Sequence, residues 1–168
     1  MSTNTPALLR VEARAAAALP ASDQVRLTYE ERTRGRLVVR LASGLEAVLA
    51  LPRNVALRHG ERLLASDGRV IEVLAAPEPL LHVEVTDAAL LARAAYHLGN
   101  RHVAVELHEG SLRVARDTVL EQLLRGLGLA PVRIDAPFEP ESGAYGHAHA
   151  HLGDVGRLAP VIHEYRRS

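Results

Sequence analysis

The chain has 168 residues, of which 48% are hydrophobic but only 3% aromatic. That length suits one medium-sized domain or two small ones. Its 20 basic and 20 acidic residues give a formal net charge of zero, which argues against broad nucleic-acid binding because that function needs a basic surface. The chain has no cysteine, which excludes disulfides, thiolate nucleophiles and cysteine-ligated zinc or iron–sulfur sites.

Neither a secretion signal nor a membrane span is visible in the sequence. The first twenty residues lack a basic start followed by a long apolar run and a cleavage site. No apolar run approaches the length of about eighteen residues that a membrane helix requires. We therefore expect a cytoplasmic protein that does not bind a membrane.

Residues 1–76 are predicted to form a small, mostly-β domain. Four segments have the composition of strands, at residues 36–41, 45–51, 61–65 and 69–74. The Asp67-Gly68 step between the last two is typical of a hairpin turn. Residues 13–19 fit either a helical turn or a strand. Two prolines then predict a stiff linker at residues 75–79, because proline disrupts regular structure.

Residues 78–140 are predicted to form a ferredoxin-like domain, since the expected order of elements is β-α-β-β-α-β. The strands are expected at residues 82–85, 102–108, 112–116 and 129–135. The first helix should begin after Thr86 or Asp87 and end at Gly99, a residue type suited to a left-handed stop.

The second helix of this domain is predicted from a capping box at residues 118–121 and ends at Gly128. Periodicity is lost from Pro137 onward. We expect residues 141–168 to form a flexible tail that contains several histidines. The predicted fold class is therefore α+β, with a mostly-β N-terminal domain, a C-terminal ferredoxin-like domain and a His-containing tail.

Alternation along the predicted strands assigns side chains to the two faces of the second sheet. The valines and leucine of residues 102–108 should lie beneath the helices, as should Val132 and Ile134, with Arg133 pointing outward. The open face is then expected to carry five polar side chains: His82, Glu84, His102, Glu106 and His108. Imidazole and carboxylate groups together can bind a divalent ion.

The candidate metal ligands are His102 and the three tail histidines His147, His149 and His151. A lone histidine on an open sheet face is usually only solvated, but two copies of His102 across a dimer axis could form a shared site. The tail histidines alternate, so they share one side of an extended chain, and short His-rich tracts commonly bind metals. Whether His97, His108 or His163 assists is left open.

Three other functions are alternatives to metal carriage. A metal hydrolase needs a closed ligand set and a general base, and the sequence has no His-Glu-x-x-His motif. An RNA-binding module would need aromatic residues on the open face and a basic surface. The third alternative is a structural assembly factor whose histidines are incidental.

Three segments, residues 96–102, 117–128 and 137–145, resemble the UreE family of urease accessory metallochaperones. The first reads Tyr-His-Leu-Gly-Asn-Arg-His and the last reads Pro-Phe-Glu-Pro-Glu-Ser-Gly-Ala-Tyr. The resemblance is strong over residues 80–146 and extends to the N-terminal half only in pattern.

The resemblance implies a carrier, not an enzyme, that delivers Ni(II) as cargo to apo-urease. It implies a homodimer joined through the C-terminal domains, with His102 as the ligand shared across the interface and the tail histidines as additional ligands. Zn(II) or Cu(II) is expected to bind the same site. The implied partners are an accessory GTPase and the urease maturation complex. The N-terminal domain is expected to be similar to the peptide-binding module of Hsp40-type chaperones.

The sequence departs from the family pattern in two places. Residues 114–118 contain no histidine, although some family members have auxiliary histidines there, and the histidine tract of the tail is short. These departures favour a carrier with few nickel ions per dimer over a storage protein. The alternative is a nickel-, zinc- or copper-binding assembly or storage protein without a dedicated role in urease maturation.

Overall fold

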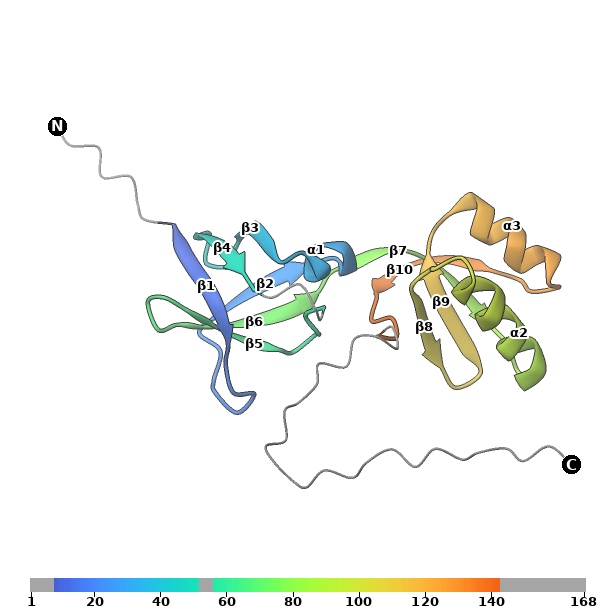
Figure 1. Cartoon of the computed structure of the whole chain (residues 1–168), viewed down its shortest axis with the longest axis horizontal. Coiled ribbons are helices and arrows are strands. Elements are labelled where there is room, and N and C mark those ends of the chain that lie inside the picture. The colour runs from blue at the N-terminus through green and yellow to red at the C-terminus, as the bar shows by residue number, and fades with distance from the viewer. Residues whose placement is uncertain (1–7, 52–55, 143–168) are drawn as a thin grey trace, which may run out of the picture.

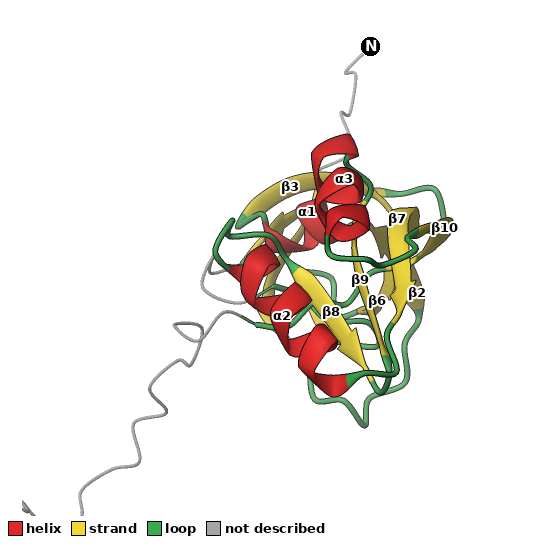
Figure 2. Cartoon of the chain, turned by 90° about the vertical axis from the view of Figure 1, so that its right-hand side faces the viewer, coloured by secondary structure: helices red, strands yellow, loops and turns green. Residues whose placement is uncertain are grey.

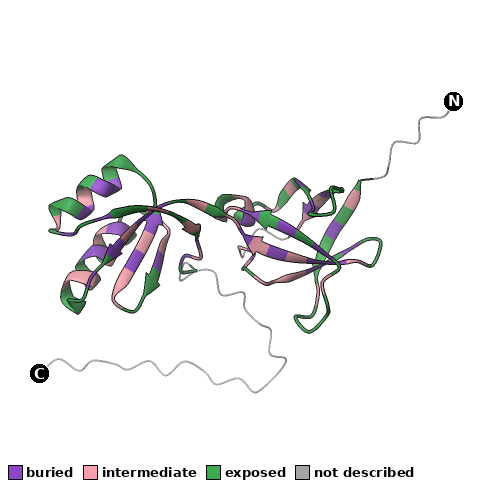
Figure 3. Cartoon of the chain, turned by 180° about the vertical axis from the view of Figure 1, so that it is seen from behind, coloured by how far each residue is buried: buried purple, intermediate pink, exposed green. Residues whose placement is uncertain are grey.

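The computed structural model describes residues 8–51 and 56–142, and these ranges form two domains with separate sheets and separate cores. Figure 1 shows the domains end to end, with strand β7, Pro77–Glu84, leading from the junction into the second domain. Figure 3 shows buried and exposed residues alternating along the strands of both sheets. The prediction of a two-domain α+β protein is confirmed.

The N-terminal domain contains a six-stranded sheet with the order β2-β6-β5-β1-β4-β3. Its strands are β1 Leu9–Arg14, β2 Asp23–Leu27, β3 Arg36–Arg40, β4 Glu46–Ala50, β5 Arg62–Ala65 and β6 Val70–Ala75. The four strands predicted from the sequence are confirmed as β3 to β6. The hairpin between β5 and β6 turns at Gly68, whose φ of 88° is open to glycine without a steric penalty.

Three elements of this domain were not predicted: β1, β2 and α1. Residues 13–19 are resolved as the end of β1 followed by a turn. The short helix α1, Tyr29–Thr33, begins at a capping box in which the Thr28 and Glu31 side chains each accept the other residue's backbone N–H. The alternation in β2 was a usable signal, because Val25 and Leu27 are buried and the residues on either side of Val25 are exposed. Strand β1 gave a weaker signal, since Val11 is its one buried residue.

The expectation that Pro77 and Pro79 lie in a linker outside regular structure is wrong. Only Ala76 separates β6 from β7, and both prolines belong to β7. The carbonyl of Pro79 accepts a hydrogen bond of 3.0 Å from the N–H of Arg116, which directly follows β9. Since a strand residue points its N–H and C=O to the same side, the missing N–H of Pro79 faces the end of that neighbouring strand, so the proline removes only a terminal bond of the ladder.

The C-terminal domain contains the four-stranded antiparallel sheet β10-β7-β9-β8 with two longer helices. Its elements after β7 are α2 Ala88–Gly99, β8 Val105–His108, β9 Ser111–Ala115, α3 Thr118–Gly126 and β10 Val132–Pro137. Both helices pack on the same face of the sheet, because Leu98 of α2 and Leu124 of α3 share one core with Leu81 and Val83 of β7. Figure 2 looks onto this domain from its outer end.

Two details of this domain correct the sequence prediction. Helix α3 is capped by Asp117, whose carboxylate accepts the N–H groups of Val119 and Leu120, and not by a box at Thr118. In β10 the faces are reversed. Arg133 is paired in register with Leu81 of the helix-side core, while Val132 opposes His82 on the other face. The alternation of an edge strand does not by itself say which face is covered.

No helix in the described ranges is long and apolar enough to cross a membrane.

Candidate metal site

His102 lies at the C-terminal end of α2 and not on a strand, so the strand predicted for residues 102–108 is wrong in its first part. Strand β8 begins only at Val105. Val103 and Val105 both pack on the helix-side core, which imitates strand alternation although Val103 lies in the connection. The open sheet face therefore lacks His102.

The backbone at His102 adopts a left-handed conformation with φ 55°, alone among the described residues other than glycine. The N–H of His102 donates to the carbonyl of Gly99 at 2.9 Å, and the N–H of Val103 donates to that of Leu98 at 3.3 Å. These two hydrogen bonds define a Schellman motif with His102 at the left-handed position. The prediction that Gly99 would be that stop is wrong, since Gly99 stays helical.

Helix α3 ends in the same way, but with glycine at the left-handed position. Gly128 has φ 84° and donates to the carbonyl of Arg125 at 2.9 Å, while Leu129 donates to that of Leu124 at 3.1 Å. The prediction that Gly128 ends this helix is confirmed. A residue with a Cβ atom costs about 1–2 kcal/mol in left-handed backbone, so His102 occupies a position where the backbone alone would favour glycine.

The side chain of His102 is exposed and, within the described ranges, its ring has no hydrogen-bond or ionic partner. It lines an open hollow of about 460 Å³ together with apolar groups such as Val105 and Leu107. Leu107 keeps 42% of its surface exposed, and Tyr96 on the adjoining helix keeps 65%. A free imidazole on an apolar surface is suited to contact with another protein surface.

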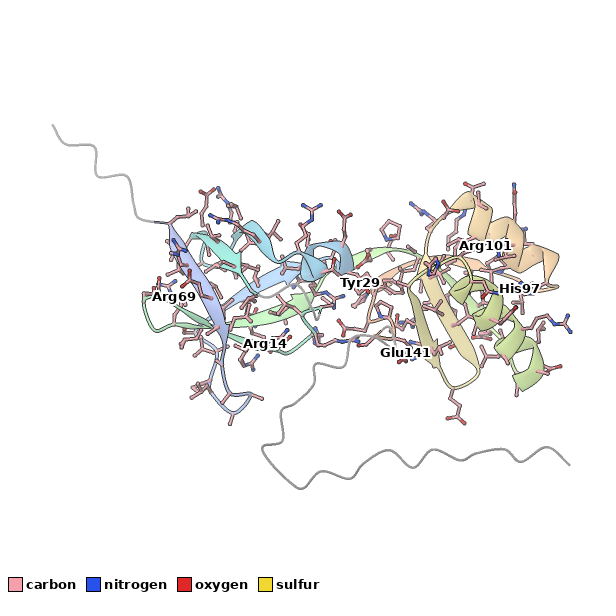
Figure 4. The ribbon with its side chains drawn as sticks, in the orientation of Figure 1. Arg14, Tyr29, Arg69, His97, Arg101 and Glu141 are labelled. Atoms are coloured by element: carbon pink, nitrogen blue, oxygen red, sulfur yellow. The ribbon has the colours of Figure 1, made fainter. Side chains whose placement is uncertain are left out.

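Residues 138–141 connect the two domains and lead the chain to this hollow. The Phe138 ring is buried and meets the Tyr29 ring of α1 edge to face at 5.5 Å. Glu139 forms an ion pair with the fully buried guanidinium of Arg32. The N–H of Glu141 donates to the carbonyl of Val105 at 2.8 Å. Figure 4 shows Tyr29 and Glu141 at the junction between the domains.

The position of Glu141 has a consequence for the segment that follows it. Glu141 and Ser142 line the same hollow as His102, so the chain leaves the described structure beside that imidazole. His147, His149, His151 and His163 lie outside the described residues. Ser142 also accepts a hydrogen bond of 2.6 Å from Arg58 of the N-terminal domain.

The neighbouring polar residues of α2 have roles within the chain. The ring of His97 meets that of Tyr96 edge to face at 5.4 Å. Arg101 donates to the carbonyl of His97 at 3.1 Å. These contacts fit the interpretation that His97 packs locally, and Figure 4 shows His97 on α2 and Arg101 in the turn that follows it.

The open face of the four-stranded sheet carries the remaining predicted groups, joined in a row through Arg113 of β9. His108 and Glu106 lie 3.0 Å apart, between Nε2 and Oε1. Arg113 approaches that same oxygen at 3.8 Å and donates to Nδ1 of His82 at 3.5 Å. His82 Nε2 is 4.0 Å from the carboxylate of Glu84.

Within the described part of one chain, no three His, Asp or Glu side chains are grouped so that they could hold a metal ion. His102 is therefore a single donor in this structure. Sequence reasoning did not identify Arg32 or Arg58, whose guanidinium groups hold residues 138–142. Arg32 follows two glutamates in a segment that reads as a solvated charged turn, and it lies 107 positions from Glu139, so no local pattern indicates its burial.

Comparison with known proteins gives matches over both domains. The family model described as UreE urease accessory protein, N-terminal domain, matches residues 7–76, and the corresponding C-terminal domain model matches residues 78–165. The urease accessory protein UreE of Dechloromonas aromatica is 47% identical, with 87% of this chain and 93% of that protein covered. The protein of the same name from Nitrosospira multiformis is 41% identical, with 94% of each chain covered.

Proposed function

The chain belongs to the UreE family of urease accessory proteins, and from this membership we propose that it carries Ni(II) as a homodimer and delivers the ion to apo-urease. The observation that carries the proposal is the placement of His102. Its imidazole is exposed, has no partner within the described ranges and stands on an apolar hollow. A single imidazole binds nickel weakly, but a twofold axis beside it would supply a second one, because a symmetric interface repeats each residue.

The surface around His102 supports dimerisation through the C-terminal domain. Tyr96 and Leu107 are large hydrophobic residues that are 65% and 42% exposed. Exposed apolar groups of this size are typical of surfaces that contact another protein. We infer that covering them with a second copy of the domain brings the two His102 side chains together at the centre of the contact.

The tail is proposed to complete the site. Its attachment supports this, since Glu141 and Ser142 line the hollow that contains His102. His147, His149 and His151 follow Ser142 by five, seven and nine residues. At about 3.4 Å per residue, a segment of that length is long enough to return to His102. Ligands that leave one at a time provide a route for passing nickel to a partner protein.

The finer features of the fold are also proposals. We infer a domain at residues 1–76, a ferredoxin-like domain at residues 78–140 and a His-containing tail at residues 141–168. The order β-α-β-β-α-β and the antiparallel sheet β10-β7-β9-β8 support the second. The N-terminal domain is proposed to contact partners of the maturation complex, which include an accessory GTPase, and the protein is proposed to act in the cytoplasm.

Calorimetric titration with nickel, combined with measurement of the molecular mass, tests the function. The native protein should bind nickel tightly as a dimer, and His102→Ala should lose the tight site while its mass and fold stay those of the native protein. His97→Ala is the matched control, because it removes an imidazole from the same helix. Tight binding that survives in His102→Ala would refute the assignment. A nickel-binding storage protein is the alternative, and it would bind many ions in both variants.

A further inference from the structure

Three carboxylate side chains are buried within the described ranges: Asp23, Glu106 and Glu121. A buried carboxylate is stable only when its oxygens are hydrogen-bonded or paired with opposite charge. Glu121 meets this condition fully, since one oxygen accepts from Arg125 at 2.8 Å and the other from Arg133 at 2.9 Å. The hydrogen bonds from Arg133 and then Arg125 lower the pKa of Glu121.

Asp23 is satisfied in the same manner. One of its oxygens accepts the backbone N–H groups of Gln24 and Ser43, at 2.8 and 3.2 Å. The other accepts the Ser43 hydroxyl at 2.5 Å and Arg69 at 3.3 Å. Burial raises the pKa of Asp23, but these hydrogen bonds outweigh that effect and the pKa is lowered overall.

Glu106 is the exception among the three. Its residue is 8% exposed, yet its Oε2 atom is buried without a hydrogen-bond partner in the described structure. Its other oxygen, Oε1, has one hydrogen bond, to Nε2 of His108 at 3.0 Å. The guanidinium of Arg113 lies at 3.8 Å from Oε1, too far for a hydrogen bond.

We propose that His108 and Glu106 form a second site for a divalent metal ion, separate from His102 and present in each subunit. When two donor atoms each lie about 2.1 Å from an ion and their bonds to it form a right angle, the two atoms are about 3.0 Å apart. The observed separation of Nε2 and Oε1 is 3.0 Å. The pair is thus already spaced as two adjacent ligands of an octahedral ion.

The chemistry of the pair limits the ion to a class. One imidazole and one carboxylate suit nickel, zinc or copper better than calcium or magnesium, which prefer oxygen ligands alone. The His108 side chain is 43% exposed and that of Glu106 is 10% exposed, so the open coordination positions for water lie on the His108 side of the ion. With the ion bound, Nε2 provides the ligating lone pair and the ring proton resides on Nδ1.

The site differs from His102 in place and in strength. His108 lies at the end of β8 that is farther along the chain from His102. The two sites also lie on different faces of the sheet, because Val105 and Leu107 face the helix side, whereas Glu106 is opposite Arg113 on the open face. Arg113 contributes a positive charge near the ion, and two protein ligands bind less tightly than a closed set. The site therefore loads after His102 and holds nickel more weakly.

A full-length background variant isolates this site. In it, the proposed ligands His102, His147, His149 and His151 and the further histidine His163 are all replaced by alanine. Equilibrium dialysis against Ni(II) chloride should find a single weakly bound ion per subunit in this variant. Adding His108→Ala should abolish that ion, and adding Glu106→Gln, which keeps the shape of the side chain, should do the same. Adding His97→Ala should leave it unchanged, and circular dichroism checks the fold of each variant.

A second readout locates the ion. Ni(II) is paramagnetic and broadens the NMR signals of nearby nuclei, so the signals of residues 106, 108 and 113 should disappear first in the background variant. Arg113→Met should tighten binding, because it removes the opposing charge. The proposal is overturned if the background variant binds no nickel, if His108→Ala retains the ion, or if the broadening centres elsewhere. None of these outcomes touches the dimer site, because His102 is absent throughout.

Discussion

The N–H of Val103 donates to the carbonyl of Leu98 across the end of α2, and the residue that this hydrogen bond forces into left-handed backbone is His102. The equivalent bond at the end of α3 joins Leu129 to Leu124 and encloses Gly128 instead. The same type of turn thus contains glycine at the end of α3, where no side chain is needed, and histidine at the end of α2, where the side chain faces the apolar hollow. Strain kept at one such position is a physical reason to assign it a function.

The first prediction concerns stability at this turn. His102→Gly should raise the free energy of unfolding by about 0.5–1 kcal/mol. Glycine removes the strain of the left-handed backbone, but it also increases the conformational entropy of the unfolded chain, which offsets part of the gain. The same variant should lose tight nickel binding. Urea unfolding followed by circular dichroism measures the first effect, and nickel calorimetry the second.

Gly128→His is the matched control for that prediction. A Cβ atom at Gly128 would meet no atom within 4 Å, so only the backbone conformation opposes the change. This variant should be destabilised by about 1 kcal/mol. If His102→Gly proves less stable than His102→Ala, the account of strain at the α2 terminus is wrong.

The second prediction concerns the ion pair between the domains. Arg32→Met should lower the free energy of unfolding by about 3 kcal/mol, because it removes the donor that serves Glu139 and the carbonyl of Leu57 and leaves buried groups unpaired. Arg34→Met removes an exposed arginine paired with Glu30 on the same short segment, and it should cost less than about 1 kcal/mol. Equal losses in the two variants would show that the junction does not depend on Arg32.

The third prediction concerns acid. Hydrogen bonds from Arg133 and Arg125 lower the pKa of Glu121 below its ordinary 4.5, so its contribution to stability is complete above that pH and is lost as the pH falls through the lowered value. Glu121→Gln should therefore be less stable than the native protein at neutral pH, and the difference should shrink in acid. Urea unfolding across that range measures it. A difference that stays constant with pH would contradict the assigned pairing.

The fourth prediction concerns the tail. Replacement of His147, His149 and His151 by alanine should reduce the number of nickel ions bound per dimer and leave the ion held by the two His102 side chains. Binding in both proteins should weaken in acid, because protonated imidazole cannot bind a metal. Mass spectrometry under native conditions counts the ions. Loss of every ion in the tail variant would show that the tail, and not the dimer interface, holds the nickel.

Local patterns in the sequence predicted much of the secondary structure because they reflect local causes. The Asp67-Gly68 turn, the stop at Gly128 and the apolar alternation of β3 and β4 each depend on residues close in the chain. The start of β8 was misplaced because Val103 buries its side chain from a turn, and a two-residue spacing cannot distinguish this from a strand.

Non-local pairing accounts for what the sequence did not indicate. Arg32 is buried by contact with Phe138 and Glu139, and Arg113 reaches both His82 and Glu106 only because β9 lies between β7 and β8. The role of His102 as a shared ligand was inferred from the family motif. Its left-handed backbone was not predicted, because Gly99, three residues earlier, is a residue type more typical of a left-handed helix end. The pairing of two subunits is beyond any pattern within one chain.

Mixed dimers test the central claim that two copies of His102 form one nickel site. Native protein and His102→Ala, produced together and loaded with limiting nickel, give three dimers that native mass spectrometry separates by mass. The account predicts that tightly bound nickel is found on the dimer with two native subunits and is missing from the mixed and fully substituted dimers. Nickel held equally by mixed and native dimers, or by monomers, would contradict it.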